Sequence, residues 1–546
     1  MTAPASTSRR TSLATGATYA VLALTMADNT MVGVAVPRIR GDFRAGVTSL
    51  EWIVAGYIVS FAGLLFTGGV LGDRYGRKRA LLTGVAVFAA GAVVAATAPN
   101  VQILVLGRVI QGVGAACSEP GTLSLVRQLY PDRVRRARVL GGWAAASGVA
   151  LAAGPVAAGL LVALGGWRAV FWGEFVAAAV AGLVGAVLLL ESKDPAPGRD
   201  IAGQVSIAVT LSALVFALIA GQDHGFTSPA VVVAWVASAT SLVVFLAVER
   251  RAANPVVDLG LLRDRQVSAG LLAAAASTFA LFSVLLLVSL DLQVVGGYSG
   301  LATAAVFTPM TLVMVLAGPI GGWLVVERGV RTTLALGLLI AAAALGALDA
   351  TLGRPVNLVV LGAFLTAMGA GLGLVVAPMV GTVLARVPAS RSGMGAAAVT
   401  AGREIGGVVG VTVLGAILYA RLFSGLTDRL TQIGIPVAYR SIVIDSVRKG
   451  APIPKVAPPA PAGGHPGLVA QFLAHVKQAL IDRTVDAGKS AYVDSVRAAL
   501  VVGVCVLVAG AVGVLVLLRH HDHRRQGDID VAVTARPGDD TPIATR

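Results

Sequence analysis

The sequence predicts an all-α integral membrane protein with fourteen transmembrane helices. Hydrophobic residues make up 56% of the 546 residues and charged residues only 13%, whereas a soluble domain carries about 25% charged residues. About 20 apolar residues cross a bilayer as a helix, and this chain contains fourteen apolar runs of roughly that length. The runs lie near residues 13–37, 50–71, 80–98, 101–125, 139–163, 169–190, 203–221, 230–248, 267–290, 300–326, 333–350, 356–385, 396–420 and 496–518.

The basic residues predict the orientation of these spans. With fourteen spans, both termini lie on the same side as six of the connecting loops. These tails and loops together carry 26 Lys and Arg residues, against five in the six short loops opposite. Because basic residues are retained in the cytoplasm, both termini are predicted to be cytoplasmic. The net charge of +15 therefore reflects membrane topology and does not indicate a nucleic-acid partner. Only six of the 43 basic residues are Lys, a bias typical of GC-rich genomes, so we expect the plasma membrane of a bacterium.

Composition and motifs predict that the protein is not an enzyme. The two cysteines, Cys117 and Cys505, lie inside apolar runs and indicate neither a disulfide nor a zinc site. No H-E-x-x-H, G-x-S-x-G or Cys/His pattern occurs. We therefore expect no catalytic residue, no metal and no cofactor.

One segment, residues 421–495, has a soluble composition. It contains the Pro-rich stretch 451–466, followed by apolar residues at i+4 spacing: Leu468, Phe472, Val476 and Leu480. This pattern predicts a small helical cap outside the membrane, joined by an irregular linker. An insertion without a role and a docking site for a partner remain alternatives.

A charged glycine-rich motif follows the second span. Its glycines allow a tight turn and close helix packing, its basic residues hold the loop in the cytoplasm, and its aspartate is expected to cap the next helix. The residues are Gly69, Asp73, Arg74, Gly76, Arg77 and Lys78. In this motif the chain resembles the major facilitator superfamily, and the motif implies a gating loop.

Further motifs make the chain similar to the fourteen-span drug:proton antiporters of that superfamily. They are Asp28-Asn29-Thr30, Arg108-x-x-Gln111-Gly112-x-Gly114, Gly154-Pro155 and Trp167-Arg168-x-x-Phe171. The resemblance implies two six-helix halves with two additional helices between them, and proton-coupled export of amphipathic or cationic drugs. The expected parts are an N-terminal half at 1–190, linking helices at 191–266, helices 9–13 at 267–420, the extracytoplasmic insertion at 421–495, helix 14 at 496–518 and a cytoplasmic tail at 519–546.

Two charged residues inside the spans are candidates for proton coupling. Asp28 lies about 12 Å from the outer end of span 1 and Arg108 about 10 Å from the outer end of span 4, at 1.5 Å per residue. Charged residues inside spans are rare and usually functional. We expect the two to form a proton-sensitive pair, with Asp28 carrying the proton because Arg does not release its own.

Four further residues are candidates for the substrate cavity: Gln111, Glu119, Glu404 and Asn29. Glu119 follows Arg108 by eleven residues and so faces the same way on a helix; we expect it near the cytoplasmic surface, where it attracts cations or serves only as an interfacial acid. Glu404 is a second protonation candidate or a member of a local ion pair. Glu174 in span 6 is expected to be structural and outside the cavity.

Gly154-Pro155 in span 5 resembles the antiporter signature of the family. Proline removes a backbone donor and bends the helix, and glycine lets a neighbouring helix approach. A generic kink is the alternative. The expected partners are small hydrophobic or cationic molecules, protons and the bilayer, with the chain acting as a monomer. A dedicated exporter of one endogenous product and a transport-inactive sensor or scaffold are the rival functions.

Overall fold

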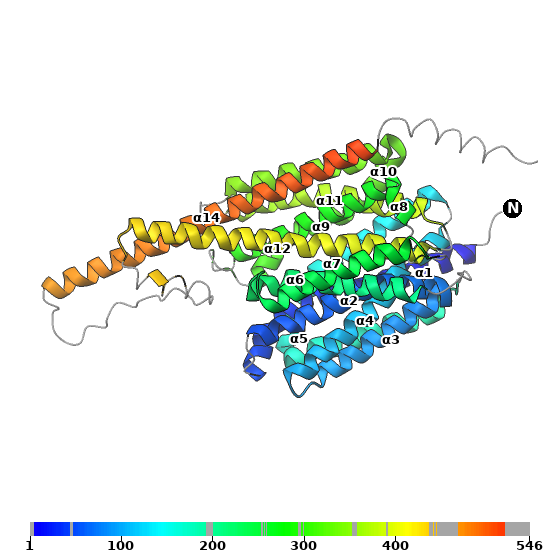
Figure 1. The fold of residues 1–546 in the computed structure, drawn as a ribbon, viewed down its shortest axis with the longest axis horizontal. Helices are drawn as coiled ribbons and strands as arrows, with labels where there is room; N and C mark the ends of the chain where they lie inside the picture. The colour runs from blue at the N-terminus through cyan, green and yellow to red at the C-terminus, as the bar shows by residue number, and fades with distance from the viewer. Residues whose placement is uncertain are drawn as a thin grey trace, which may run out of the picture.

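The computed structural model is a bundle of long helices (Figure 1). It describes residues 5–43, 47–130, 132–192, 200–252, 259–292, 300–351, 357–388, 391–435 and 468–518, together with the single positions 255, 257, 296, 298, 440, 441 and 444.

Five helices form the N-terminal half. They are α1 (Ala5–Phe43), α2 (Val47–Tyr75), α3 (Arg77–Ala96), α4 (Val101–Leu129) and α5 (Arg133–Leu188). The backbone of α5 leaves the helical region at Gly165 and at Gly166, where φ is 71°. Because only glycine adopts this conformation without strain, the two residues turn the chain between the fifth and sixth predicted spans.

Two helices lie between the halves. α6 (Ile201–His224) and α7 (Pro229–Glu249) pack against each other, and α6 also packs against α2 and α12. Ser238 Oγ donates to the carbonyl oxygen of Thr210 at 3.0 Å, and Ser241 Oγ donates to that of Ser206 at 2.8 Å. These bonds satisfy hydroxyl groups that would otherwise face lipid, so the pair forms a unit attached to the N-terminal half through α2.

The C-terminal half contains the remaining spans. It is made of α8 (Leu259–Arg263), α9 (Arg265–Leu290), α10 (Gly300–Ala347), η2 (Leu348–Thr351), α11 (Leu358–Arg386), α12 (Ser392–Gln432) and α14 (Leu468–Leu517). α10 breaks at Gly329, where φ is 79°. Among the described residues, 12 helices are long and apolar enough to cross a membrane, and α5 and α10 each contain two spans joined at glycine. The fourteen predicted spans are therefore confirmed.

The sequence predicts a separate helical cap within residues 421–495, but in the structure the helices on either side of this segment extend into it. α12 continues to Gln432, and α14 begins at Leu468 and runs unbroken into the last span, so both helices project beyond the bundle (Figure 1). Arg429 Nη2 pairs with Asp494 Oδ2 at 2.5 Å between them. The apolar i+4 row of α12 explains the extension, because Leu422, Leu426 and Leu430 are buried in the same cluster as Ala491 and Tyr492 of α14. The stretch 451–466, the side chains of Leu468, Phe472, Val476 and Leu480, and the tail 519–546 lie outside the described residues.

Candidate functional site

The two halves meet at the face of the bundle where α1, α3 and α12 begin and α2 ends, here called the N-face. Asp73, in the last turn of α2, accepts hydrogen bonds from the backbone N–H groups of Gly393 at 3.0 Å and Met394 at 3.2 Å, the second and third residues of α12. Its Oδ1 also pairs with Arg77 Nη2 at 2.7 Å. Asp73 therefore occupies the N-terminus of a helix in the other half, where unsatisfied N–H groups and the helix dipole favour an anion.

The expectation that Asp73 caps the following helix is wrong. Gly76, at φ 115°, is the only residue between α2 and α3, so Asp73 belongs to α2 and points across to α12. Glu191 caps α3 instead, accepting from the backbone N–H groups of Lys78 and Arg79, both at 3.2 Å. Glu191 was not singled out in the sequence, because a cap 113 residues away leaves no local pattern.

Glycines bring the halves into backbone contact on the same side. A Cβ at Gly69 would lie 2.6 Å from the carbonyl oxygen of Gly393, and one at Gly141 of α5 would lie 2.7 Å from the backbone nitrogen of Pro319 of α10. Deeper in the bundle, a Cβ at Gly148 would lie 2.7 Å from the terminal methyl group of Met314. These contacts run from the N-face to the middle of the bundle, so this structure is closed at the N-face.

Asp28 and Arg108 form the predicted pair at the centre of the N-terminal half. Arg108 Nη1 donates to Asp28 Oδ1 at 2.5 Å and Nη2 donates to Oδ2 at 3.1 Å, a bidentate arrangement. The Arg108 Nε group donates to the carbonyl oxygen of Ile53 at 3.1 Å, and the Tyr57 ring lies 4.5 Å from the guanidinium carbon. Asp28 is 0% and Arg108 1% exposed. Each buried charge is matched and hydrogen-bonded, so removing either partner would leave the other charge buried without compensation.

The pair extends through Gln111 to Glu174. Gln111 Oε1 accepts from Arg108 Nη1 at 2.8 Å, and Gln111 Nε2 donates to Glu174 Oε2 at 2.8 Å. Gln111 therefore belongs to this buried network. Glu174, which the sequence predicts to be structural and outside the cavity, is joined to the pair through Gln111. Its position as a charged residue inside a span was the available signal.

The sequence predicts Glu119 near the inner surface, but in the structure its side chain is buried, 0% exposed. α4 continues to Leu129, so Glu119 lies about 15 Å from the end of the helix at 1.5 Å per residue. Thr25 Oγ1 donates to its Oε2 at 3.3 Å, while its Oε1 has no hydrogen-bond partner in the described part of the chain. Arg403 and Glu404 of α12 interact with it electrostatically from the opposite half.

A small cavity lies between the halves. Arg403 reaches into it with its guanidinium carbon 5.4 Å from the Trp143 ring, and Arg403 Nη1 has no hydrogen-bond partner among the described residues. Arg403 and Trp143 were not among the sequence candidates, since no local spacing relates them. Asn29, Gln111, Glu119 and Glu404 do not line this cavity; Asn29 Nδ2 donates to Thr25 of its own helix at 3.3 Å. The lining residues are Trp143, Ser147, Leu151, Ser277, Thr278, Leu281, Met314, Leu372, Val376, Met379 and Arg403.

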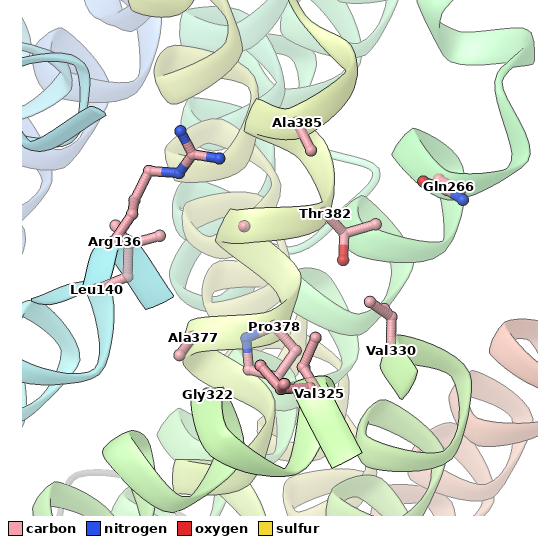
Figure 2. A pocket seen from close by; sticks show the side chains of 12 residues that line it. Arg136, Leu140, Gln266, Gly322, Val325, Val330, Ala377, Pro378, Thr382 and Ala385 are labelled. Atoms are coloured by element: carbon pink, nitrogen blue, oxygen red, sulfur yellow. The ribbon is translucent and has the colours of Figure 1, made fainter. Parts of the chain in front are cut away.

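A second cavity lies towards the N-face between α5, α10 and α11 (Figure 2). Arg136 enters from α5, and Gln266 of α9 lies on the opposite side. Val325, Pro378 and Thr382 contribute to its walls, which are mostly apolar. Both cavities therefore lie at the boundary between the halves. Transporters built from two such halves are expected to bind their ligands at this boundary.

Gly154 brings α5 against α1. Thr30 Oγ1 donates to the carbonyl oxygen of Leu151 at 3.1 Å, and a Cβ at Gly154 would lie 2.1 Å from that hydroxyl oxygen. At Pro155 the backbone stays helical, and α5 breaks only at Gly165 and Gly166. The predicted close approach is therefore present, whereas the break in α5 lies elsewhere.

Comparisons with known proteins agree with this architecture. The sequence profile of the Major Facilitator Superfamily matches residues 18–411. The multidrug resistance protein Stp of Mycobacterium tuberculosis is 32% identical over 79% of this chain and 81% of its own length. The tetracenomycin C resistance and export protein of Streptomyces glaucescens is 29% identical over 94% of this chain and 93% of its own. The crystal structure of the human organic anion transporter MFSD10 superposes with a TM-score of 0.54 at 16% identity, covering 76% of this chain and 94% of that one.

Proposed function

This chain belongs to the Major Facilitator Superfamily, and from that premise we propose that it is a proton-coupled antiporter that exports amphipathic or cationic small molecules. In this proposal the N-face is cytoplasmic, because it carries the basic-rich segments. The protein lies in the plasma membrane of a bacterium with both termini inside, and it functions as a monomer.

The buried Asp28–Arg108 pair carries the proposal of proton coupling. When Asp28 is ionised, its carboxylate holds the guanidinium through two hydrogen bonds. Protonation removes the negative charge and weakens the pair, which leaves the Arg108 charge to find other partners. A proton can thereby change the relative free energies of the inward- and outward-open states, because it interacts differently with each.

The contacts between the halves support alternating access. Asp73 and the glycine contacts hold the N-face closed in this state. Opening the N-face requires α12 to move away from Asp73, and α10 from Gly141, so the two halves would rock as units. Such a movement exposes the cavities between the halves to one face at a time.

The substrate class follows from the cavity and the relatives. The lining is mostly apolar, with Trp143, Met314 and Met379 beside a few hydroxyl groups, and methionine adapts to ligands of varied shape. One relative is named for multidrug resistance and another for tetracenomycin C resistance and export. The second name also favours an exporter of one product as an alternative.

Dye export from inverted membrane vesicles tests the proposal. An imposed inside-acid pH gradient should drive uptake of ethidium and of neutral and dicationic dyes into vesicles that contain the protein, and a proton ionophore should abolish it. Uptake that survives the ionophore would disprove proton coupling. Uptake of a single compound among many would favour the dedicated exporter. Deletion of residues 451–466 tests the scaffold alternative: a transporter should still take up dye, whereas a scaffold acting through that segment would lose its function.

A further inference from the structure

We propose that Glu174 is a second proton-carrying carboxyl group of the coupling site, and that it carries a proton separate from that of Asp28. This inference rests on the proposed function and adds a residue and a proton to its mechanism.

Glu174 lies in the buried interior and in the same network as the coupling pair. Its side chain is 2% exposed and comes from the second segment of α5, after the turn at Gly165 and Gly166. Gln111 uses its amide oxygen on Arg108 and its amide nitrogen on Glu174, both at 2.8 Å. Because each end of the amide is occupied, Gln111 fixes Glu174 relative to the guanidinium.

The charges of the network do not balance unless a proton is bound. Both oxygens of Asp28 already pair with Arg108, so the single positive charge is matched. Glu174 is a second acid, and its Oε1 has no hydrogen-bond partner among the described residues. An ionised carboxylate without its own counter-charge is very costly to bury.

The like charges of the two acids lead to the same conclusion. Glu174 and Asp28 repel each other when both are ionised, because the buried site does not screen the two negative charges. A proton on one of them removes this repulsion. The other groups facing the pair are Arg108 and Gln111 from α4 and the Tyr57 ring from α2, and among these charged and titratable neighbours no second cation balances Glu174.

The cycle follows from this arrangement. In the closed N-face state Glu174 holds one proton while Arg108 stays bound to Asp28, and Asp28 then takes a second proton from the outer side and releases Arg108. When the N-face opens, both carboxyl groups release their protons to the cytoplasmic side and Arg108 pairs with Asp28 again. Glu174 is reloaded from the outer side once the N-face has closed, so two protons move inward for each substrate molecule exported.

The steady-state accumulation of ethidium in proteoliposomes tests the proton number. With the membrane potential held at zero and a pH gradient of one unit, each coupled proton raises the attainable concentration ratio about tenfold. Glu174→Gln, which mimics the neutral acid, should therefore lower the final ratio about tenfold. Glu174→Asp keeps a carboxyl group, so it should slow transport but reach the wild-type ratio. A purely structural role would change the rate and leave the ratio unchanged.

A matched control and a second measurement separate the possible failures. Glu249 of α7 is also a buried glutamate, 5% exposed, but lies outside the network and binds the backbone N–H of Val257; Glu249→Gln should reach the wild-type ratio. Infrared titration of the purified protein should show one fewer titrating carboxyl group in Glu174→Gln. If the wild type does not accumulate ethidium, the proposed function fails for cations, and the infrared titration still decides the role of Glu174. An unchanged ratio or an unchanged titration in Glu174→Gln overturns this inference.

Discussion

Asp73 accepts a hydrogen bond from the backbone N–H of Gly393 at 3.0 Å, across 320 residues of sequence and across the boundary between the two halves. The carboxylate lies at the positive end of α12, where the first N–H groups have no partner within the helix. The bond must break whenever the halves separate at the N-face. Asp73 thus caps α12 and also holds α12 against α2, which stabilises the closed N-face; its two bonds to Gly393 and Met394 are called the latch.

Replacing Asp73 with Asn should weaken this latch. The amide oxygen can still accept a hydrogen bond, but the charge that strengthens the bonds to Gly393 and Met394 is lost. We expect a loss of about 1–2 kcal/mol for the closed state, which is about a factor of 5–30 in its population. Hydrogen exchange at the start of α12 should accelerate accordingly. Glu191→Gln is the control, since it should accelerate exchange at Lys78 and Arg79 and leave α12 unchanged; equal protection of α12 in Asp73→Asn and the wild type would contradict the latch.

Replacing Asp28 with Asn should abolish uphill transport and destabilise the fold. The change leaves the buried Arg108 charge without its main partner, a loss of about 3–5 kcal/mol in other proteins. Thermal unfolding in detergent should report the lower stability, and the double variant Asp28→Asn/Arg108→Gln should recover part of it without recovering transport. Full pH-gradient-driven transport in Asp28→Asn would eliminate Asp28 as a proton carrier.

Two glycines of α5 provide a matched test of helix packing. A Cβ at Gly154 would lie 2.1 Å from Thr30 Oγ1 and 2.9 Å from the carbonyl oxygen of Ala27, so Gly154→Ala should destabilise the protein by about 1–3 kcal/mol. Nothing lies within 4 Å of a Cβ at Gly159. Gly159→Ala should be neutral or stabilise the helix by up to about 1 kcal/mol. Unfolding temperatures in detergent compare the two, and equal effects would show that the α1–α5 approach does not depend on Gly154.

Glu119 and Arg403 should have opposite effects on substrate charge. Glu119→Gln keeps an acceptor for Thr25 but removes a negative charge that faces Arg403. We expect export of dicationic dyes to fall at least fivefold, with neutral dyes little changed, since the remaining Arg403 charge repels cations. Arg403→Gln should raise the preference for cations. Identical export of cationic and neutral dyes by Glu119→Gln and the wild type would show that Glu119 has no role in substrate selection.

The spans and the candidate charged residues could be predicted from the sequence. Hydropathy is a sum over neighbouring residues, so each apolar run was visible without knowledge of its neighbours. Asp28 and Arg108 stood out because a charge inside a span is costly wherever it occurs. Their predicted depths from the outer ends of spans 1 and 4 were close enough to indicate a pair, and the structure joins them at 2.5 Å.

The partners of the remaining residues could not be predicted, because they depend on how the helices rotate and pack. In the sequence Glu174 is an isolated acid in span 6, and only the fold places it on Gln111. The sequence predicts a cap helix and a separate last span where the structure has one helix, α14, because its packing against α12 at Ala491 and Tyr492 leaves no local pattern. By itself, the sequence determined which segments are buried in the membrane and which side chains are costly there. Only the tertiary structure decided which of those side chains meet, because contacts across helices depend on three-dimensional packing and leave no spacing in the chain.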